Sequence, residues 1–133
     1  MIKLDAQEYV GNNTSIKVLT RTPQLDYPEH SHDFSELVLV KSGSGLHIVN
    51  NVHSIILPNS ISSICEQDYH QYIDNKNVNL VNVLYNKQQL KINRNIADII
   101  KRLELSKRNF LVYDNDFKRL ESIVKLIENE QES

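Results

Sequence analysis

Two histidines and one glutamate are spaced so that their side chains could share one face of a strand. Residues 29–43, EHSHDFSELVLVKSG, contain His30, His32 and Glu36 in the pattern His-x-His-x3-Glu-x6-Gly. Successive side chains of an extended strand point to opposite faces, so we expect these three residues of equal parity to project from a single strand toward one point. Imidazole and carboxylate groups together suit a divalent metal such as Zn, Fe, Mn or Ni, and they could equally line a polar sugar pocket.

Length and composition exclude several classes of protein. A chain of 133 residues has room for one domain. Its formal net charge of -2 and its pI of about 6.2 give no basic surface for nucleic acid, so DNA is not expected as a direct partner of this segment. A single cysteine rules out an internal disulfide, and residues 1–10 lack the apolar core of a signal peptide, so we expect a cytoplasmic location. No apolar run approaches the length of a membrane span.

Most of the chain should form an all-β sandwich or barrel. Between residues 16 and 85, short β-branched and aliphatic runs alternate with clusters of Gly, Pro, Asn and Ser. These runs predict seven strands, at residues 16–22, 34–41, 46–49, 52–57, 61–65, 69–73 and 80–85. Residues 42–45, Ser-Gly-Ser-Gly, supply the backbone freedom for one reversal of the chain.

Asn50 and Asn51 are typical of a two-residue hairpin turn with positive φ. Such a turn would place His47 opposite Ser54 and His53 opposite Ile48. Paired residues share a face, so the two histidines should lie on opposite faces and only one of them can join a common site. His53 is expected to face solvent, while His47 could be a pocket wall or a surface residue.

Beyond residue 86 the sequence becomes helical in character, because Gly and Pro are absent and apolar residues recur every three or four positions. Two stripes predict two helices; the first is Ile96, Ile99, Ile100 and Leu103, and the second is Phe117, Leu120, Val124 and Ile127. Asp114 or Asp116 is the expected N-cap of the second helix, and residues 110–113 are the expected extended connector. The second stripe should pack on its own domain, and the alternative is pairing with another subunit.

The spacing of these polar residues resembles the cupin superfamily. Its first motif is matched by His30, His32, Glu36 and Gly43, although Gln24 replaces the leading Gly. The second motif survives in spacing only, with Asn59, Cys65 and Gln67 in the places of Gly, Pro and Gly and with His70 in the place of the histidine. The resemblance implies a small β-barrel of the jelly-roll type, and it implies His30, His32, Glu36 and His70 as the ligands where a metal is bound.

A polar cluster without metal is the alternative to a metal site. A buried polar group that is left unpaired costs about 1 to 3 kcal/mol, so four such groups facing one cavity need a metal, water or a hydroxyl-rich ligand as a partner. Tyr72 shares the face of His70 if the strand is regular, and it could stack on a sugar or fill the core.

A closer resemblance is to the N-terminal effector-binding domain of AraC-type transcriptional activators, especially the L-rhamnose regulators of that family. It spans residues 17–92 and is carried by residues 29–49, by Asn82-Val83-Leu84-Tyr85 and by Leu90-Lys91. It implies a cupin-like sugar-binding barrel with an N-terminal arm at residues 1–92, and a helical dimerisation and linker segment at residues 93–133. The family's C-terminal helix-turn-helix domain, which binds DNA, is expected to lie outside this sequence.

These observations predict a sugar-sensing regulatory domain that forms a homodimer through its C-terminal helices. The expected ligand-binding residues are His30, His32, Glu36, His47, His70 and Tyr72, and L-rhamnose is the expected sugar. A metal-dependent cupin enzyme, such as a dioxygenase or sugar isomerase, is the alternative. We find no further acid or base beyond the ligand set, which favours the sensor. A purely structural dimerisation module would leave the inward polar cluster unexplained.

Overall fold

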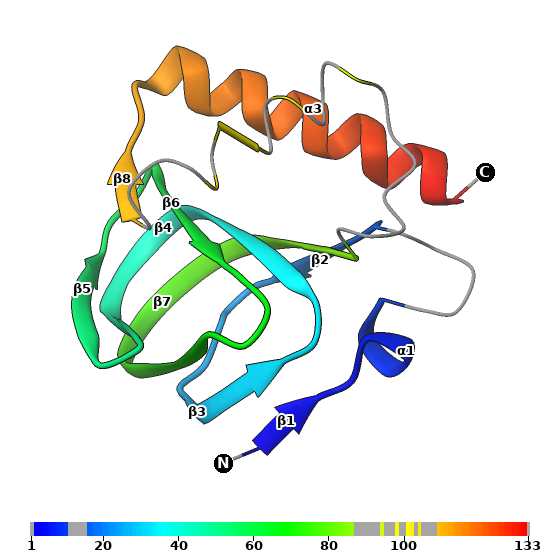
Figure 1. Ribbon diagram of the computed structural model, residues 1–133. Coiled ribbons are helices and arrows are strands. Elements are labelled where there is room, and N and C mark those ends of the chain that lie inside the picture. The colour runs from blue at the N-terminus through cyan, green and yellow to red at the C-terminus, as the bar shows by residue number, and fades with distance from the viewer. Residues whose placement is uncertain are drawn as a thin grey trace.

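The computed structural model describes residues 2–10, 16–86 and 109–132, together with residues 94, 98, 101, 102 and 104. Strands dominate this part of the chain, which confirms the predicted mainly β class (Figure 1). The strands are β1 (Ile2–Leu4), β2 (Ile16–Arg21), β3 (Tyr27–His32), β4 (Ser35–Val49), β5 (Val52–Ile56), β6 (Ser60–Ile64), β7 (Tyr69–Tyr85) and β8 (Asn109–Leu111). The helices are α1 (Ala6–Tyr9) and α3 (Asp114–Glu132).

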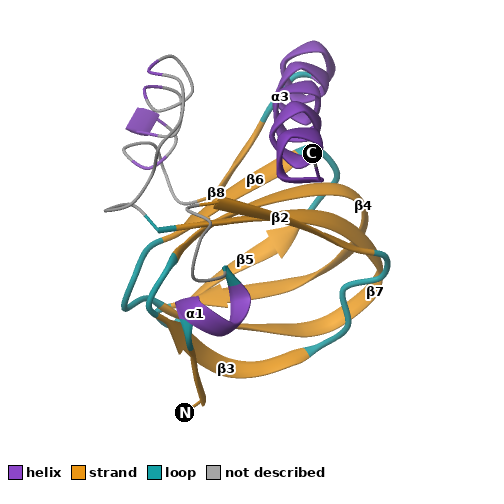
Figure 2. Ribbon diagram, turned by 90° about the vertical axis from the view of Figure 1, so that its right-hand side faces the viewer, coloured by secondary structure: helices purple, strands orange, loops and turns teal. Residues whose placement is uncertain are grey.

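The eight strands form one folded sheet in the order β1-β3-β7-β4-β6-β8, with β2 also pairing with β7 and β5 with β4. The described pairings are antiparallel except that β1 is parallel to β3. Figure 2 shows the long strands β4 and β7 curving so that the sheet wraps around an interior. The sheet curves like a barrel, but it is not closed, because its strand order ends at β1 and β8.

Two pairs of predicted strands are in fact single long strands. Predicted segments 34–41 and 46–49 are both part of β4, and segments 69–73 and 80–85 are both part of β7. Gly43 explains how β4 passes the expected reversal without breaking: its φ is 96°, and the pairing with β7 shifts register around it. A Cβ atom there would lie 2.3 Å from the backbone oxygen of Asn77, so only glycine fits without displacing β7.

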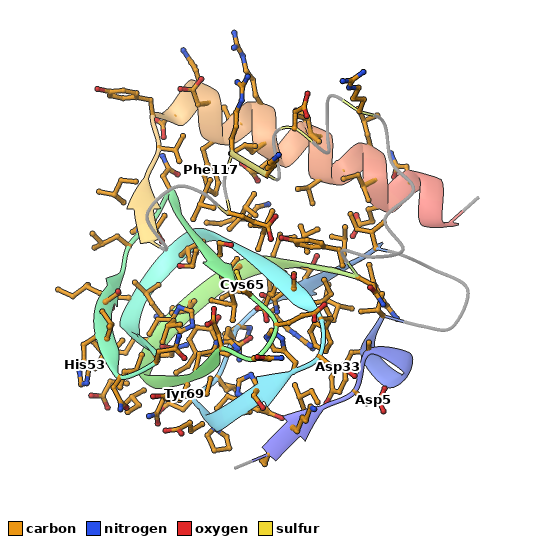
Figure 3. The ribbon with its side chains drawn as sticks, viewed as in Figure 1. Asp5, Asp33, His53, Cys65, Tyr69 and Phe117 are labelled. Atoms are coloured by element: carbon orange, nitrogen blue, oxygen red, sulfur yellow. The ribbon has the colours of Figure 1, made fainter. Side chains whose placement is uncertain are left out.

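The prediction of a single strand through His30, His32 and Glu36 is wrong. The two histidines lie on β3 and the glutamate lies on β4, with a bend at residues 33–34 between the strands. Asp33 fastens this bend to the N-terminal segment, because its carboxylate accepts a hydrogen bond from the Ala6 N–H (2.6 Å) and its own N–H donates to the Leu4 oxygen (3.3 Å) (Figure 3). The sequence YPEHSH of β3 carries no aliphatic run, which is why no separate strand was expected there.

The predicted β4–β5 hairpin is confirmed. Asn50 and Asn51 have φ values of 48° and 65°, and the register pairs His47 with Ser54 and Ile48 with His53. His53 is exposed and His47 is buried, so the two histidines face opposite sides as expected (Figure 3 shows His53 at the outer edge of β5).

The C-terminal helix α3 lies over β2 and packs on its own domain, as the default interpretation predicted (Figure 2). Its buried side is formed by Phe117, Leu120, Ile123, Val124 and Ile127, which contact a core cluster that includes Val18, Leu39, Val81 and Val83. The N-cap prediction is wrong by one residue or more. The Tyr113 carbonyl accepts the first helical hydrogen bond, from the Phe117 N–H (2.9 Å), so Asp114 and Asp116 belong to the first turn, where they complement the helix dipole.

The structure describes one long C-terminal helix where the sequence predicted two. The apolar stripe of the first predicted helix, Ile96, Ile99, Ile100 and Leu103, lies outside the described residues. The connector contains β8, which pairs with β6. Among the described helices, none has the length and apolar character to cross a membrane.

We expect Phe117→Ala to lower the free energy of unfolding by about 3 to 5 kcal/mol, because it removes a buried ring and leaves a cavity under α3. Leu126→Ala is the matched control in the same helix, since Leu126 is 64% exposed and its truncation should change little. Urea denaturation followed by circular dichroism measures both. Equal effects of the two variants would contradict the packing of α3 on this domain.

Candidate functional site

The six residues predicted to bind a ligand come from three neighbouring strands and are all buried. His30 and His32 lie on β3, Glu36 and His47 on β4, and His70 and Tyr72 on β7, with exposed fractions between 1% and 6%. The register places His70 opposite His30 on one side and Val49 on the other, and it places Tyr72 opposite both Tyr27 and His47. Because β7 lies between β3 and β4, it brings the side chains of those two strands together with His70 and Tyr72.

Three of the predicted metal ligands form a compact group. Oε1 of Glu36 lies 3.3 Å from Nε2 of His32 and 3.8 Å from Nε2 of His70, and one ligand atom from each residue lies within 4.8 Å of the others. The group forms because the chain bends between β3 and β4. His30, the fourth predicted ligand, stacks obliquely against His70 with ring centroids 4.2 Å apart, but it is not in this group of ligand atoms.

The backbone fixes which ring nitrogens of two histidines carry hydrogen. Nδ1 of His32 lies 2.5 Å from the Phe34 carbonyl oxygen, and Nδ1 of His30 lies 2.9 Å from that of Pro28. A carbonyl oxygen only accepts, so each Nδ1 must donate, and in the neutral ring Nε2 is then a bare lone pair. Nε2 of His32 therefore turns a lone pair toward the Glu36 carboxylate, an arrangement that favours a shared proton or cation between them.

His47 acts on this group through His70. Its Nε2 lies 2.8 Å from Nδ1 of His70, and its ring stacks on Tyr72 with centroids 4.4 Å apart at an interplanar angle of 11°. Within the described part of the chain, Nε2 of His70 has no hydrogen-bond partner, and neither has Nε2 of His32. Metal-binding histidines are commonly oriented in this way, with one ring nitrogen held by the protein and the other free.

Burial sets the protonation states of the cluster. It lowers the pKa of both His47 and His70 to about 3 and also lowers that of His30, so we expect these rings to be neutral near pH 7. Burial alone would raise the pKa of Glu36, but the side-chain contact with His32 and the electrostatic interaction with the neighbouring imidazoles, which could share a proton with the carboxylate, hold it below its ordinary value. Burial also raises the pKa of Tyr72, so its hydroxyl keeps its proton.

A cavity of about 430 Å³ opens beside the cluster. Four of the predicted residues line it, namely His30, Glu36, His70 and Tyr72, whereas His32 and His47 lie behind this wall. Apolar side chains, including those of Tyr27, Phe34 and Leu84, form much of the remainder.

Three further polar residues, Arg21, Gln24 and Asn82, line the cavity, and the sequence patterns did not predict them as ligand-binding residues. Arg21 is exposed at the end of β2, while Asn82 lies buried on β7. Asn82 faces the interior from the same side of β7 as the buried residues Leu80 and Leu84. An amide within an aliphatic row of equal parity is the signal that could have identified it.

Comparisons with known proteins give similar folds and similar sequences. No family model matches the sequence. In structure the chain is similar to ToxT from Vibrio cholerae, with a TM-score of 0.55 and 16% identity over 86% of this chain and 48% of that one, and a second ToxT structure gives a TM-score of 0.51 and 15% identity over 84% and 48%. The domain therefore has the β fold found in ToxT.

In sequence the chain is similar to the HTH-type transcriptional activator RhaS of Escherichia coli, with 38% identity over 77 residues, which are 58% of this chain and 28% of that protein. RhaS of Shigella boydii matches to the same extent. The chain thus spans less than a third of the length of these curated relatives. The chain is therefore similar to part of RhaS, and the predicted resemblance to AraC-type activators is confirmed.

We expect the protein to lose stability as the pH falls below 6.5. Because the unfolded histidines bind protons near pH 6.5 and buried His47 and His70 do so only near pH 3, the loss should approach about 1.4 kcal/mol per pH unit for each ring between these values. Ionised Glu36 adds a loss in the same direction below its unfolded pKa near 4.5. Urea titrations at pH 7, 6 and 5 measure the slope.

His47→Gln should make that slope shallower, because it removes one titrating ring from the buried cluster. His53→Gln is the matched control and should leave the slope unchanged, since His53 is exposed. A stability that is flat from pH 7 to pH 5 would contradict the neutral buried state of these rings.

Proposed function

We propose that this chain is the effector-sensing part of a transcriptional activator and that its cavity binds a small sugar, with L-rhamnose as the best candidate. The observation that carries the proposal is a set of buried polar atoms at one cavity that have no hydrogen-bond partner among the described residues, namely Nε2 of His70 and the hydroxyl of Tyr72, beside the Glu36 carboxylate. Similarity to RhaS supports a regulatory role rather than an enzymatic one.

A monosaccharide matches the chemistry of this wall. Its hydroxyl groups can donate to Glu36 and to the bare imidazole nitrogens, and they can accept from the Tyr72 hydroxyl. Its C–H faces can lie against Tyr27 and Phe34, which line the same cavity. A cavity of about 430 Å³ lies in the range of small-ligand sites, and it combines apolar walls with few polar groups as such sites do.

The residues also fit a divalent metal ion. The donor set would be Nε2 of His32, an oxygen of Glu36 and Nε2 of His70, because these atoms converge and the two nitrogens lack partners in the described chain. His30 would then serve as a wall of the sugar site. An ion bound there would supply a Lewis acid to which two vicinal sugar hydroxyls could coordinate.

Regulation would follow if the barrel and helices adopt two conformations that bind the sugar with different affinity. The sugar can then shift the equilibrium between these conformations by no more than the difference between its two binding free energies. We propose that residues 1–92 form the sensing segment and that residues 93–133 form a linker segment. DNA binding would then belong to a domain outside this sequence, and the protein would act in the cytoplasm. A homodimer through α3 would have to use the face of that helix turned away from the sheet, because its apolar stripe is buried in this domain.

A metal-dependent enzyme remains the second candidate, and the His32–Glu36–His70 group is the observation that favours it. Bound redox metal together with turnover of a candidate substrate would support this alternative. Sugar binding without turnover would support the sensor.

Calorimetric titration with L-rhamnose, L-mannose, L-fucose, L-arabinose and D-xylose tests the sugar proposal. We expect one site per chain for at least one of these sugars. His70→Ala should weaken binding about tenfold or more, because it removes a buried ligand contact worth about 1.4 kcal/mol. His53→Ala, at an exposed position, should bind like the wild type. No heat with any of the five sugars at millimolar concentration would contradict the proposal.

Titration of chelator-treated protein with Co²⁺ tests the metal proposal, because the d–d absorption of cobalt reports nitrogen and oxygen coordination directly. We expect one equivalent to bind, and we expect Glu36→Gln to reduce the affinity strongly because the replaced oxygen is the charged member of the donor set. His53→Ala again serves as the control. Unchanged spectra and affinity in Glu36→Gln would place any bound metal elsewhere.

A further inference from the structure

Asn82 is the polar member of an aliphatic row on β7. Val78, Leu80 and Leu84 share its parity and are 0%, 0% and 3% exposed. Asn82 pairs across the sheet with Val38 on one side and Leu19 on the other. A leucine would fill this inward position as its neighbours do, so packing alone does not explain an amide there.

The side chain of Asn82 is buried and incompletely bonded. The residue is 7% exposed, it lines the 430 Å³ cavity, and its Oδ1 atom has no hydrogen-bond partner in the described part of the chain. Asn79, three residues earlier on the same strand, shows the contrast, because its Nδ2 donates to Oγ of Ser42 at 3.0 Å. A buried amide oxygen without a donor destabilises the fold unless something entering the cavity supplies one.

Strand β7 also supplies two further polar groups of this cavity, His70 and Tyr72. His70 and Tyr72 precede the residues with positive φ, Asp74 and Asn77, and Asn82 follows them. The Tyr72 hydroxyl is likewise buried without a partner in the described chain. One strand therefore presents an acceptor amide and a protonated phenol to the same space.

We propose that Asn82 is a specificity-determining residue that accepts a hydrogen bond from one hydroxyl group of a neutral polyhydroxy ligand. This inference rests on the proposed sugar-binding function and adds to it. An amide oxygen needs a donor, so an anionic group of a ligand is disfavoured at this position, whereas a sugar hydroxyl satisfies it. The residue discriminates against ligands that lack that hydroxyl, because binding them would leave the amide buried and unpaired.

The test combines Asn82→Leu with monodeoxy derivatives of L-rhamnose in calorimetric titrations. Asn82→Leu should bind L-rhamnose about tenfold more weakly than the wild type. One of the deoxy derivatives should lack the hydroxyl that hydrogen-bonds to Asn82. Wild type and Asn82→Leu should bind that derivative with equal affinity, which in a double-mutant cycle indicates a direct interaction between Asn82 and the missing hydroxyl. Asn79→Leu is the matched control and should keep the wild-type affinity, because Asn79 does not line the cavity.

Thermal unfolding of the ligand-free proteins separates a functional amide from a structural one. Asn82→Leu should raise the Tm, because a buried unpaired amide is replaced by an apolar side chain, whereas Asn79→Leu should lower it by breaking the bond to Ser42. A lower Tm for Asn82→Leu, or equal L-rhamnose affinity in Asn82→Leu and wild type, overturns the role of Asn82 alone. Failure of the wild type to bind any sugar overturns the proposed function and with it this inference.

Discussion

The antiparallel pairing of β4 with β7 is the constraint on which the rest of the structure depends. The two strands pair from Ser35 opposite Tyr85 to Val49 opposite His70, through the register shifts around Gly43. Every other described strand except β1 and β8 pairs directly with one of these two. Because side chains alternate along a strand, a one-residue slip of β4 would turn Glu36 and His47 away from the interior that His70 faces. Register, and with it the polar site, is therefore set by this one ladder.

The interior that this ladder encloses combines apolar packing with polar groups that the protein does not satisfy by itself. Leu80 and Val78 are completely buried, while His70, Tyr72 and Asn82, which line the cavity, each retain a buried polar atom without a hydrogen-bond partner in the described chain. Folding stability alone would favour apolar residues at these positions. Their convergence on one cavity is the physical reason to regard the site as functional, since unsatisfied groups concentrate where a ligand is to supply the missing hydrogen bonds.

Sequence patterns predicted what depends on local chemistry and missed what depends on the path of the chain. Asn50 and Asn51 specified the hairpin and its register, and the stripe containing Phe117 specified the buried face of α3. The merger of four predicted strands into β4 and β7 was missed because residues with positive φ can bend a strand as well as end it, as Gly43 does in β4 and Asp74 and Asn77 do in β7. The His–Glu spacing suggested convergence for the wrong reason: two strands and a bend bring the groups together. Asn82 was missed because its environment depends on long-range pairing.

The same strand that faces the cavity also supports the C-terminal helix. On β7, Leu80, Asn82 and Leu84 face inward, whereas Val81, Val83 and Tyr85 belong to the core cluster that contains Phe117 and Ile127 of α3. Strand β2 pairs with this part of β7 and contacts α3 from the same side. Packed side chains are one route by which two sites can be coupled, and β7 places such packing across a single sheet. A ligand that hydrogen-bonds to Asn82 would therefore contact the strand whose other face packs against α3.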